Sequence, residues 1–213
     1  MKLSDEERGA VMNEALLKKM REILLDRYGV DTNDAKCHYS TQNYAFIFPN
    51  HPYMIRVSMT PKKTRKEILS ELMWVDDLKQ FKQTICEPSV SLKGNLLEEF
   101  EIDGVTYRAS MLRTARGNVQ VSTEMTPMFF ICVGELLGMI HYASTNEREI
   151  GMNYKRRTIA ESFAAQKEKV WEKLSPAVQA KIEAIENEVN ALPQDLGKYG
   201  ICHGDFHSNN FFV

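Results

Sequence analysis

The chain has 213 residues, of which 43% are hydrophobic and 26% charged, and its formal net charge at pH 7 is -2. This length can bury a substantial core and fits one or two domains. The nearly neutral charge excludes a general electrostatic attraction to nucleic acid or to anionic membranes.

Cysteine usage and hydropathy indicate where the protein works. The four cysteines are far apart and form no C-x-x-C pair, so we expect reduced thiols. The start of the chain is too charged for a signal peptide. The most apolar run, Phe129 to Ala143, contains Glu135 and His141 and is too short to span a bilayer. We therefore expect a cytoplasmic protein.

The first element that the sequence predicts is an amphipathic helix. Ser4 precedes acidic residues in a helix-start pattern, and apolar residues then recur at helical spacing from Val11 to Leu24. The pair Tyr28-Gly29 ends the run. We interpret its apolar stripe as part of the core.

A β-hairpin is predicted next. Two β-type runs, 44–48 and 53–57, flank the turn-forming cluster 49–52. The segment before them, Cys37 to Asn43, is polar, and we expect it to be a loop.

One charged residue interrupts the second strand of this hairpin. Arg56 lies between Ile55 and Val57, and side chains alternate along a strand, so Arg56 points to the opposite face from both. Taken alone, such an arginine is interpreted as the outward residue of an edge strand.

The segment 62–81 reads as a helix with one apolar stripe. Glu67 and Glu71 lie one turn apart near its start. Many glutamates on helices are simply solvated, so these two carry no function by themselves.

A second hairpin follows a break at Glu87-Pro88-Ser89. The β-type runs 95–101 and 105–112 flank the sequence Ile102-Asp103-Gly104, whose Asp-Gly pair is a hairpin turn signal. The second run leads into Met111 to Gly117, where the glycine gives the chain the freedom to leave the strand.

The rest of the chain is predominantly helical. Helical patterns run from Thr126 to Tyr142, from 159 to 174 and from 176 to 192. His141 lies near the end of the first of these, and we interpret it as a structural histidine.

The most informative stretch is 201–213. It places a carboxylate at Asp205 and an amide at Asn210, with four residues between them and an apolar Phe-Phe-Val run after them. Kinase catalytic loops share this arrangement: the Asp accepts the proton of the attacking hydroxyl, and the Asn holds a metal ion. A tight loop of this length can turn both side chains toward one phosphoryl group.

Three other interpretations compete for these residues. The tetrapeptide at 204–207 fits the G-D-x-H opening of metallophosphoesterases, which need later ligand clusters for which the sequence after Asn210 leaves no room. The Cys, His and Asp side chains of 202–207 have the chemistry of zinc ligands, but such dense spacing leaves little room for tetrahedral geometry. A plain surface turn is the third, because His, Gly, Asp and Asn are common in turns. We favour the kinase loop.

The segment His203 to Asn210 resembles the H-G-D-x-H-x-x-N signature of the aminoglycoside phosphotransferase and choline kinase-like family. Members of that family are small-molecule kinases built like protein kinases. The resemblance spans nearly the whole chain and implies an α+β, protein-kinase-like two-lobe fold. A small β-rich N-terminal lobe with helices would cover 1–112, a hinge 113–117, and a mostly helical, truncated C-terminal lobe 118–213.

The resemblance also implies an activity. The protein would be an enzyme that moves the γ-phosphoryl group of ATP, with Mg²⁺, to a hydroxyl of a small molecule such as an aminoglycoside, homoserine or choline. Asp205 is the implied catalytic residue and Asn210 the implied metal ligand. The implied partners are ATP and this acceptor, rather than nucleic acid or a membrane, and the oligomeric state is left open.

Nucleotide-binding residues follow from the same resemblance. Ser40 and Thr41 lie where the family has a loop that covers the phosphates. Arg56 matches the strand residue that contacts the α- and β-phosphates. Glu71 matches its ion-pair partner on the next helix, with Glu67 in reserve.

Leu112 and Arg113 match the hinge, whose backbone groups hydrogen-bond adenine in the family. One departure concerns a second metal-binding Asp, which such kinases carry shortly after the catalytic loop. The sequence stops at Val213, before that position. We expect a fragment of the complete enzyme, and the alternative is a non-catalytic kinase-like nucleotide-binding or regulatory module.

Overall fold

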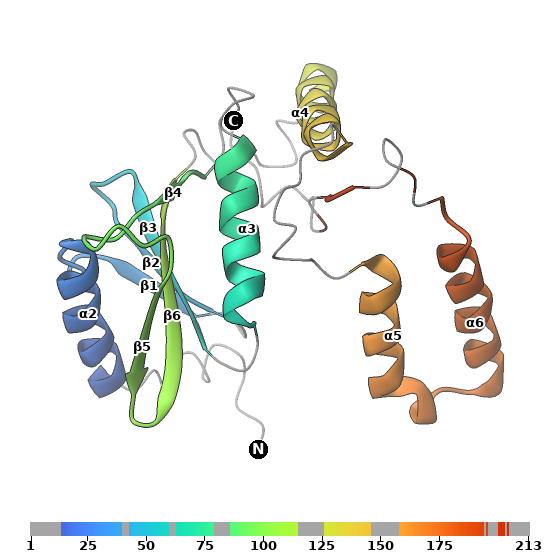
Figure 1. Cartoon of the computed structure of the whole chain (residues 1–213), viewed down its shortest axis with the longest axis horizontal. Coiled ribbons are helices and arrows are strands. Elements are labelled where there is room, and N and C mark those ends of the chain that lie inside the picture. Colours follow the sequence, from blue (N-terminus) through green and yellow to red (C-terminus); the bar gives the residue numbers. More distant parts are fainter. Residues whose placement is uncertain are drawn as a thin grey trace. The chain divides into compact units, whose positions relative to one another are not determined.

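The chain combines an antiparallel sheet with helices (Figure 1). In its computed structural model, the residues described are 14–39, 43–59, 63–78, 86–114, 126–145, 158–193, 195, 200–202 and 204. The described residues divide into two compact units, the first ending at Phe130 and the second running from Ile131 to Gly204. The hinge at 113–117 and the lobe boundaries beside it stay predictions, because 115–125 lies outside the described residues.

A six-stranded antiparallel sheet forms the body of the first unit. Its strands are β1 (Lys36–Tyr39), β2 (Asn43–Ile47), β3 (Tyr53–Met59), β4 (Pro88–Ser89), β5 (Glu98–Ile102) and β6 (Val105–Arg113). The order is β1-β2-β3-β6-β4, with β5 also pairing with β6. Strand β6 is therefore central: β3 pairs along one edge, and β5 and β4 share the other.

The two predicted hairpins are confirmed. Strands β2 and β3 pair directly, as do β5 and β6. Asp103 and Gly104 close the second hairpin with φ angles of 52° and 78°. Two positive φ angles define a type I′ turn, whose twist matches the flanking strands, and Asp and Gly tolerate this left-handed region.

Helix α2 (Glu14–Tyr28) covers one face of the sheet. Met20 and Leu24 are fully buried there, and the Tyr28 hydroxyl donates a hydrogen bond of 2.8 Å to the carbonyl oxygen of Ala109. The buried strand residues in the same cluster are Tyr44, Phe46, Ile55, Val57, Phe100, Ile102, Tyr107, Ala109 and Met111. The predicted core helix is confirmed from Glu14 onward, and its earlier part lies outside the described residues.

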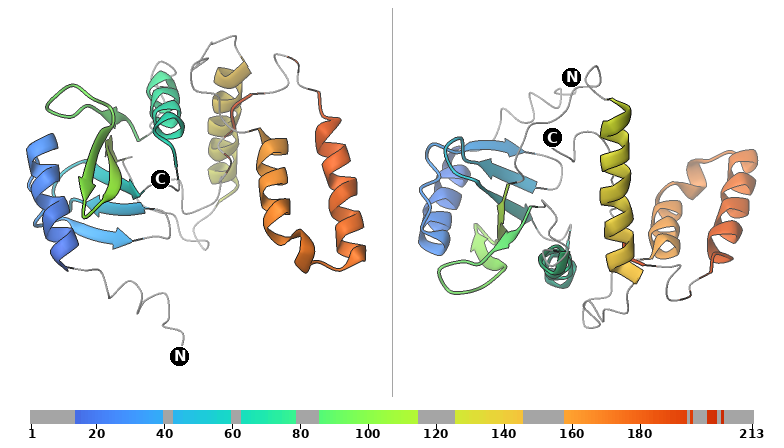
Figure 2. Two further views of the ribbon diagram at one scale, coloured as in Figure 1. Left: turned by 60° about the horizontal axis from the view of Figure 1, so that its bottom comes forward. Right: turned by 90° about the horizontal axis from the view of Figure 1, so that it is seen from above.

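Helix α3 (Arg65–Leu78) packs on the opposite face of the sheet (Figures 1 and 2). Its buried Ile68 and Leu72 contact Leu97 and Leu112. Since strand residues alternate, Ile55 and Val57 face α2 while Arg56 faces α3, as predicted.

Two segments differ from the sequence-based expectation. Residues Cys37 to Tyr39, predicted to be part of a loop, form strand β1 and pair with Phe46 to Tyr44 of β2. The prediction was wrong because β1 is an edge strand, where polar residues remain solvated while the backbone pairs. Pro88 and Ser89, predicted as a break, form the short strand β4 at an edge, where proline is tolerated.

The second unit is mainly helical in its described part, as predicted. It includes most of α4 (Pro127–Thr145), α5 (Ile159–Val170), the short 3₁₀ helix η3 (Trp171–Lys173) and α6 (Pro176–Asn190). Figure 2 shows α5 and α6 side by side as a helical hairpin. Lys167 joins them through a 2.6 Å ion pair with Glu186. None of the helices in the described part of the chain combines the length and hydropathy needed to cross a membrane.

Glu98 is a buried carboxylate that ties the turn before β5 to the sheet. The Ser91 hydroxyl and the Asn95 amide donate hydrogen bonds of 2.6 and 3.0 Å to its Oε1, and Arg27 Nη1 lies 3.6 Å from Oε2. Burial alone would raise the pKa of Glu98, but these hydrogen bonds and the Arg27 charge outweigh burial and hold it below its usual value.

Glu98→Gln should therefore lower the free energy of unfolding at pH 7 by about 1.5–3 kcal/mol, the usual worth of hydrogen bonds to a charged group. A depressed folded-state pKa stabilises above the unfolded-state value and is lost as pH falls through the folded one. The difference between variant and wild type should thus shrink below pH 4.5. Urea unfolding across this range measures it, with Glu101→Gln on the exposed face of β5 as control. A difference independent of pH would contradict the assignment.

Candidate functional site

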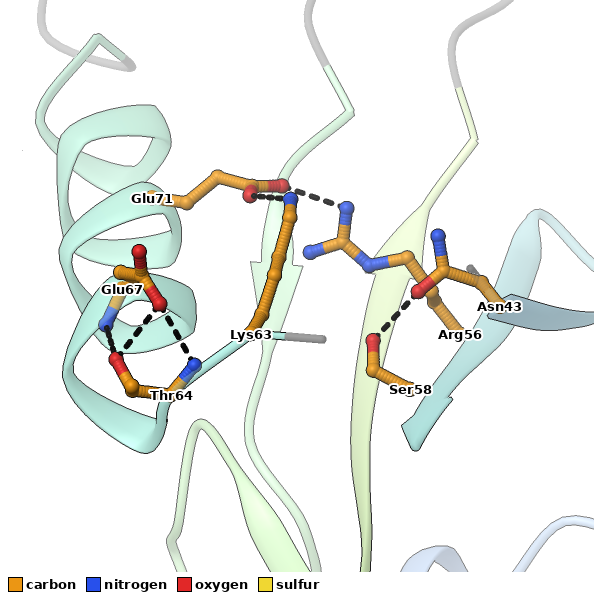
Figure 3. Close-up of polar contacts among 7 residues, drawn as sticks. All are labelled: Asn43, Arg56, Ser58, Lys63, Thr64, Glu67 and Glu71. Atoms are coloured by element: carbon orange, nitrogen blue, oxygen red, sulfur yellow. Dashed lines mark hydrogen bonds and ion pairs between the residues drawn. The ribbon is translucent and has the colours of Figure 1, made fainter. Parts of the chain in front are cut away.

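An ion pair between β3 and α3 forms the centre of the site (Figure 3). Arg56 Nη1 donates to Glu71 Oε1 at 2.6 Å, and the two side chains are 19% and 22% exposed. Strand alternation points Arg56 toward α3, and the docking of α3 brings Glu71 over it. The predicted pairing of these two residues is confirmed, and salt screens such a sheltered pair less than an exposed one.

Glu71 holds a second cation. Lys63, two residues before α3, places its Nζ 3.0 Å from Glu71 Oε2. Each carboxylate oxygen of Glu71 therefore accepts from a different side chain. Burial alone would raise the pKa of Glu71, but the charges and hydrogen bonds of Arg56 and Lys63 outweigh burial and hold it below its usual value. Glu71 is thus ionised at neutral pH.

The second terminal nitrogen of Arg56 has no partner in the part of the chain that the structure describes. Nη2 is buried and makes no hydrogen bond to any of the described residues. Ser110, directly opposite Arg56 in the β3–β6 register, also has a buried hydroxyl without a partner there. An unpaired buried donor costs about 1–3 kcal/mol. A phosphate oxygen is an acceptor that suits a guanidinium N–H, so this corner of the sheet fits a phosphorylated ligand.

Glu67, the reserve partner, has a different role. Its Oε2 accepts from the backbone N–H of Thr64 at 2.7 Å, and its own N–H donates to Thr64 Oγ1 at 3.2 Å. This reciprocal pair is a capping box, which satisfies free donors at the start of a helix. Glu67 therefore defines where α3 begins, and Glu71 follows one turn later.

Leu112 and Arg113 end the central strand. Leu112 is buried in the cluster under α3, and the exposed Arg113 donates its backbone N–H to the carbonyl oxygen of Glu87 at 2.7 Å. That N–H is occupied, so Arg113 does not offer it to adenine in this structure. Contact of these two residues with adenine stays a prediction.

The predicted catalytic loop is described only at its start. Gly204, the second residue of the motif, has a φ of 75°, in the left-handed region that favours glycine and suits a tight turn just before Asp205. Asp205 and Asn210 lie outside the described residues, as do Ser40 and Thr41 of the predicted phosphate loop. Among the residues that are described, no group of three or more His, Cys, Asp or Glu side chains could hold a metal.

Lys63 and Ser110 belong to the site and were not predicted. Ser110 carried a usable signal, because it is a hydroxyl within the otherwise apolar run Ala109 to Leu112 of a central strand. Nothing in the sequence distinguishes Lys63 from Lys62 or Lys66, and only the folded chain brings it to Glu71.

An antiparallel sheet that carries a strand cation, paired with a glutamate on the helix behind it, is the nucleotide-lobe arrangement of the protein-kinase-like fold. The chain belongs to the phosphotransferase enzyme family, whose model matches residues 38–213.

The chain is also similar to individual proteins that are named as kinases. The chain is 21% identical over 188 residues to amicoumacin kinase of Bacillus subtilis (strain 168), covering 87% of this chain and 56% of that protein. It superposes on amicoumacin kinase hAmiN, solved with AMP-PNP, Ca²⁺ and Ami, with a TM-score of 0.77 at 19% identity, over 99% of this chain and 63% of that one.

Spectinomycin phosphotransferase APH(9)-Ia, solved with ADP and spectinomycin, gives a TM-score of 0.59 at 19% identity, over 92% of this chain and 64% of that one. The kinase-like α+β fold is thereby confirmed. The chain spans less than two thirds of the length of each of these relatives.

Substitution of the two glutamates of α3 should lower the stability by different amounts. Glu67→Ala removes the glutamate half of the capping box, while Thr64 still caps the helix, and should lower the free energy of unfolding by about 1 kcal/mol. Glu71→Ala leaves Arg56 and Lys63 facing each other without their shared anion, so we expect a larger loss of about 2 kcal/mol, discounted from a fully buried pair for partial exposure.

Urea unfolding at pH 7 measures both. The loss caused by Glu71→Ala should fade as acid protonates wild-type Glu71 below its usual pKa, since a depressed pKa stabilises only above the folded-state value. A loss no larger than that of Glu67→Ala would contradict the account of the pair.

Proposed function

We propose that the protein is an ATP-dependent phosphotransferase that moves the γ-phosphoryl group of ATP to a hydroxyl of a small molecule. The observation that carries this proposal is the state of Arg56, with one nitrogen on Glu71 and the other buried without a partner among the described residues. Membership of the phosphotransferase enzyme family supports it. So do the names of the relatives, a kinase solved with AMP-PNP and a phosphotransferase solved with ADP.

In this proposal Arg56 holds the phosphates of the nucleotide. Glu71 immobilises the guanidinium through Nη1, so Nη2 is oriented before the nucleotide arrives and can make a charge-assisted hydrogen bond. Backbone groups of Ser40 and Thr41 would cover the phosphates from the loop between β1 and β2. Both contributions are positional, which suits phosphoryl transfer, where catalysis depends on placement and charge stabilisation.

The remaining roles rest on the sequence motif and the family. Asp205 would orient the hydroxyl of the acceptor and take its proton, and Asn210 would hold Mg²⁺. The backbone of Leu112 and the carbonyl oxygen of Arg113 would contact adenine, since the N–H of Arg113 is bonded to Glu87. ATP, when bound, supplies the phosphoryl group.

The proposed acceptor is a small hydroxyl-bearing molecule. Two relatives are named for amicoumacin and spectinomycin, which makes these two compounds the first to test. We also propose a cytoplasmic location, supported by the four cysteines, all of which are free thiols.

The full-length protein should bind ATP. ATP with Mg²⁺ at a hundredfold excess over its Kd should add about 2.7 kcal/mol of stability. Arg56→Ala should weaken ATP binding about tenfold or more, the worth of a hydrogen bond to a charged group. Thermal shifts over a nucleotide titration measure both, and Arg65→Ala, which removes an exposed arginine of α3, is the matched control. Unchanged ATP affinity in Arg56→Ala would reject the proposed contact between Arg56 and the phosphates.

Loss of the Asp205 carboxylate should lower the turnover number. Asp205→Asn in the full-length protein should lower kcat by about 10²-fold to 10⁴-fold while the affinity for ATP is retained, because a proton acceptor is removed and no binding group is. Phosphate transfer to a panel of hydroxyl compounds measures kcat, with the exposed Asp34→Asn as control. Near-normal turnover would reject the role of Asp205. ATP binding without transfer in the wild type would favour the non-catalytic module.

A further inference from the structure

The Arg56–Glu71 pair uses only one of the two hydrogen bonds that such a pair can make. Arginine and a carboxylate commonly join through two parallel N–H···O bonds, one to each oxygen. Here Nη1 donates to Oε1, while Oε2 accepts from Lys63 and Nη2 has no partner among the described residues. Figure 3 shows Lys63 reaching the carboxylate from the chain segment that leads into α3.

We propose that Lys63 is a positioning residue that keeps Arg56 and Glu71 joined by one hydrogen bond instead of two. By donating to Glu71 Oε2, Lys63 holds this oxygen at its own ammonium group and disfavours a second bond from the carboxylate to Arg56, so that Nη2 stays available for a phosphate oxygen of the nucleotide. The inference rests on the proposed function, since it names a residue that prepares the same site.

The driving force for closure is already present in the site. Without Lys63, Oε2 of Glu71 would lose its donor, and Arg56 Nη2 is a buried donor that finds no acceptor among the described residues. Buried polar groups left unpaired are costly, and a small rotation of the carboxylate would pair these two atoms with each other. The doubly bonded pair would give both atoms a partner, and the Nη2 N–H would then no longer be available to a phosphate.

Lys63 is held in place by more than its own side chain. Arg108 of β6 donates from Nη1 to the carbonyl oxygen of Lys63 at 3.0 Å, and its Nε donates to Glu99 at 2.7 Å. The next residue, Thr64, is fixed in the capping box. The peptide unit that follows the Lys63 Cα is thus anchored through both its carbonyl oxygen and its N–H, and the partly exposed side chain has a defined starting point for its reach to Glu71.

The first test compares variants of the full-length protein for binding of a non-hydrolysable ATP analogue by calorimetry. Lys63→Met keeps the aliphatic stem and removes the cation, and it should weaken binding about tenfold, through loss of the Arg56 contact. Lys63→Arg should restore most of the affinity, because it again places a cation on Oε2. Lys66→Met, on the exposed side of α3, should bind as the wild type does. Wild-type affinity in Lys63→Met would overturn the proposal.

A double-variant cycle separates positioning from direct contact with the nucleotide. Glu71→Gln keeps one oxygen for Arg56 but turns the other position into an amide NH₂, which accepts no hydrogen bond, so no second bond to Arg56 can form. In that background Lys63→Met should cost no further affinity. If the full loss persists, Lys63 contacts the nucleotide itself, and the positioning role is wrong.

A crystal structure of nucleotide-free Lys63→Met gives a readout independent of binding. The proposal expects Glu71 joined to Arg56 through both oxygens, and a single-bonded pair would overturn it. Failure of this proposal is distinguishable from failure of the proposed function. If the wild type binds ATP and the Lys63 variants match it, only the role of Lys63 falls. If the wild type binds no nucleotide, both fall.

Discussion

The structure of the first unit depends on one constraint: a charged side chain on a central part of the sheet must find a partner before a helix can cover it. Arg56 is directed to the face that α3 covers because Ile55 and Val57 are needed in the core under α2. Burying a charge without a partner is costly. Glu71 resolves the conflict, so the docking of α3 through Ile68 and Leu72 and the pairing of the two charges support each other.

The same constraint connects the fold to the proposed activity. A guanidinium has more donors than one carboxylate oxygen can accept, and Lys63 occupies the second oxygen. What remains is a buried N–H without an acceptor in the described part of the chain. Such a cost within a well-packed lobe is understandable where a ligand supplies the missing acceptor, and in the proposed function that ligand is the nucleotide.

Features that depend on neighbouring residues in the sequence could be predicted. Strand alternation assigned the face of Arg56, and the Asp-Gly pair located the second hairpin turn. Prediction failed for Cys37 to Tyr39, because an edge strand tolerates polar residues that also suit a loop. Lys63 could not be predicted, since its position depends on a tether to Arg108, a contact between residues far apart in the chain. The roles of Asp205 and Asn210 stay predictions.

The most direct test of this account is a crystal structure of the full-length protein with a non-hydrolysable ATP analogue and Mg²⁺. We expect Arg56 Nη1 to stay on Glu71 while Nη2 lies within hydrogen-bond distance, about 3 Å, of an oxygen of the α- or β-phosphate. A bound nucleotide whose phosphates lie away from Arg56, with Nη2 paired to a protein acceptor, would contradict the central claim.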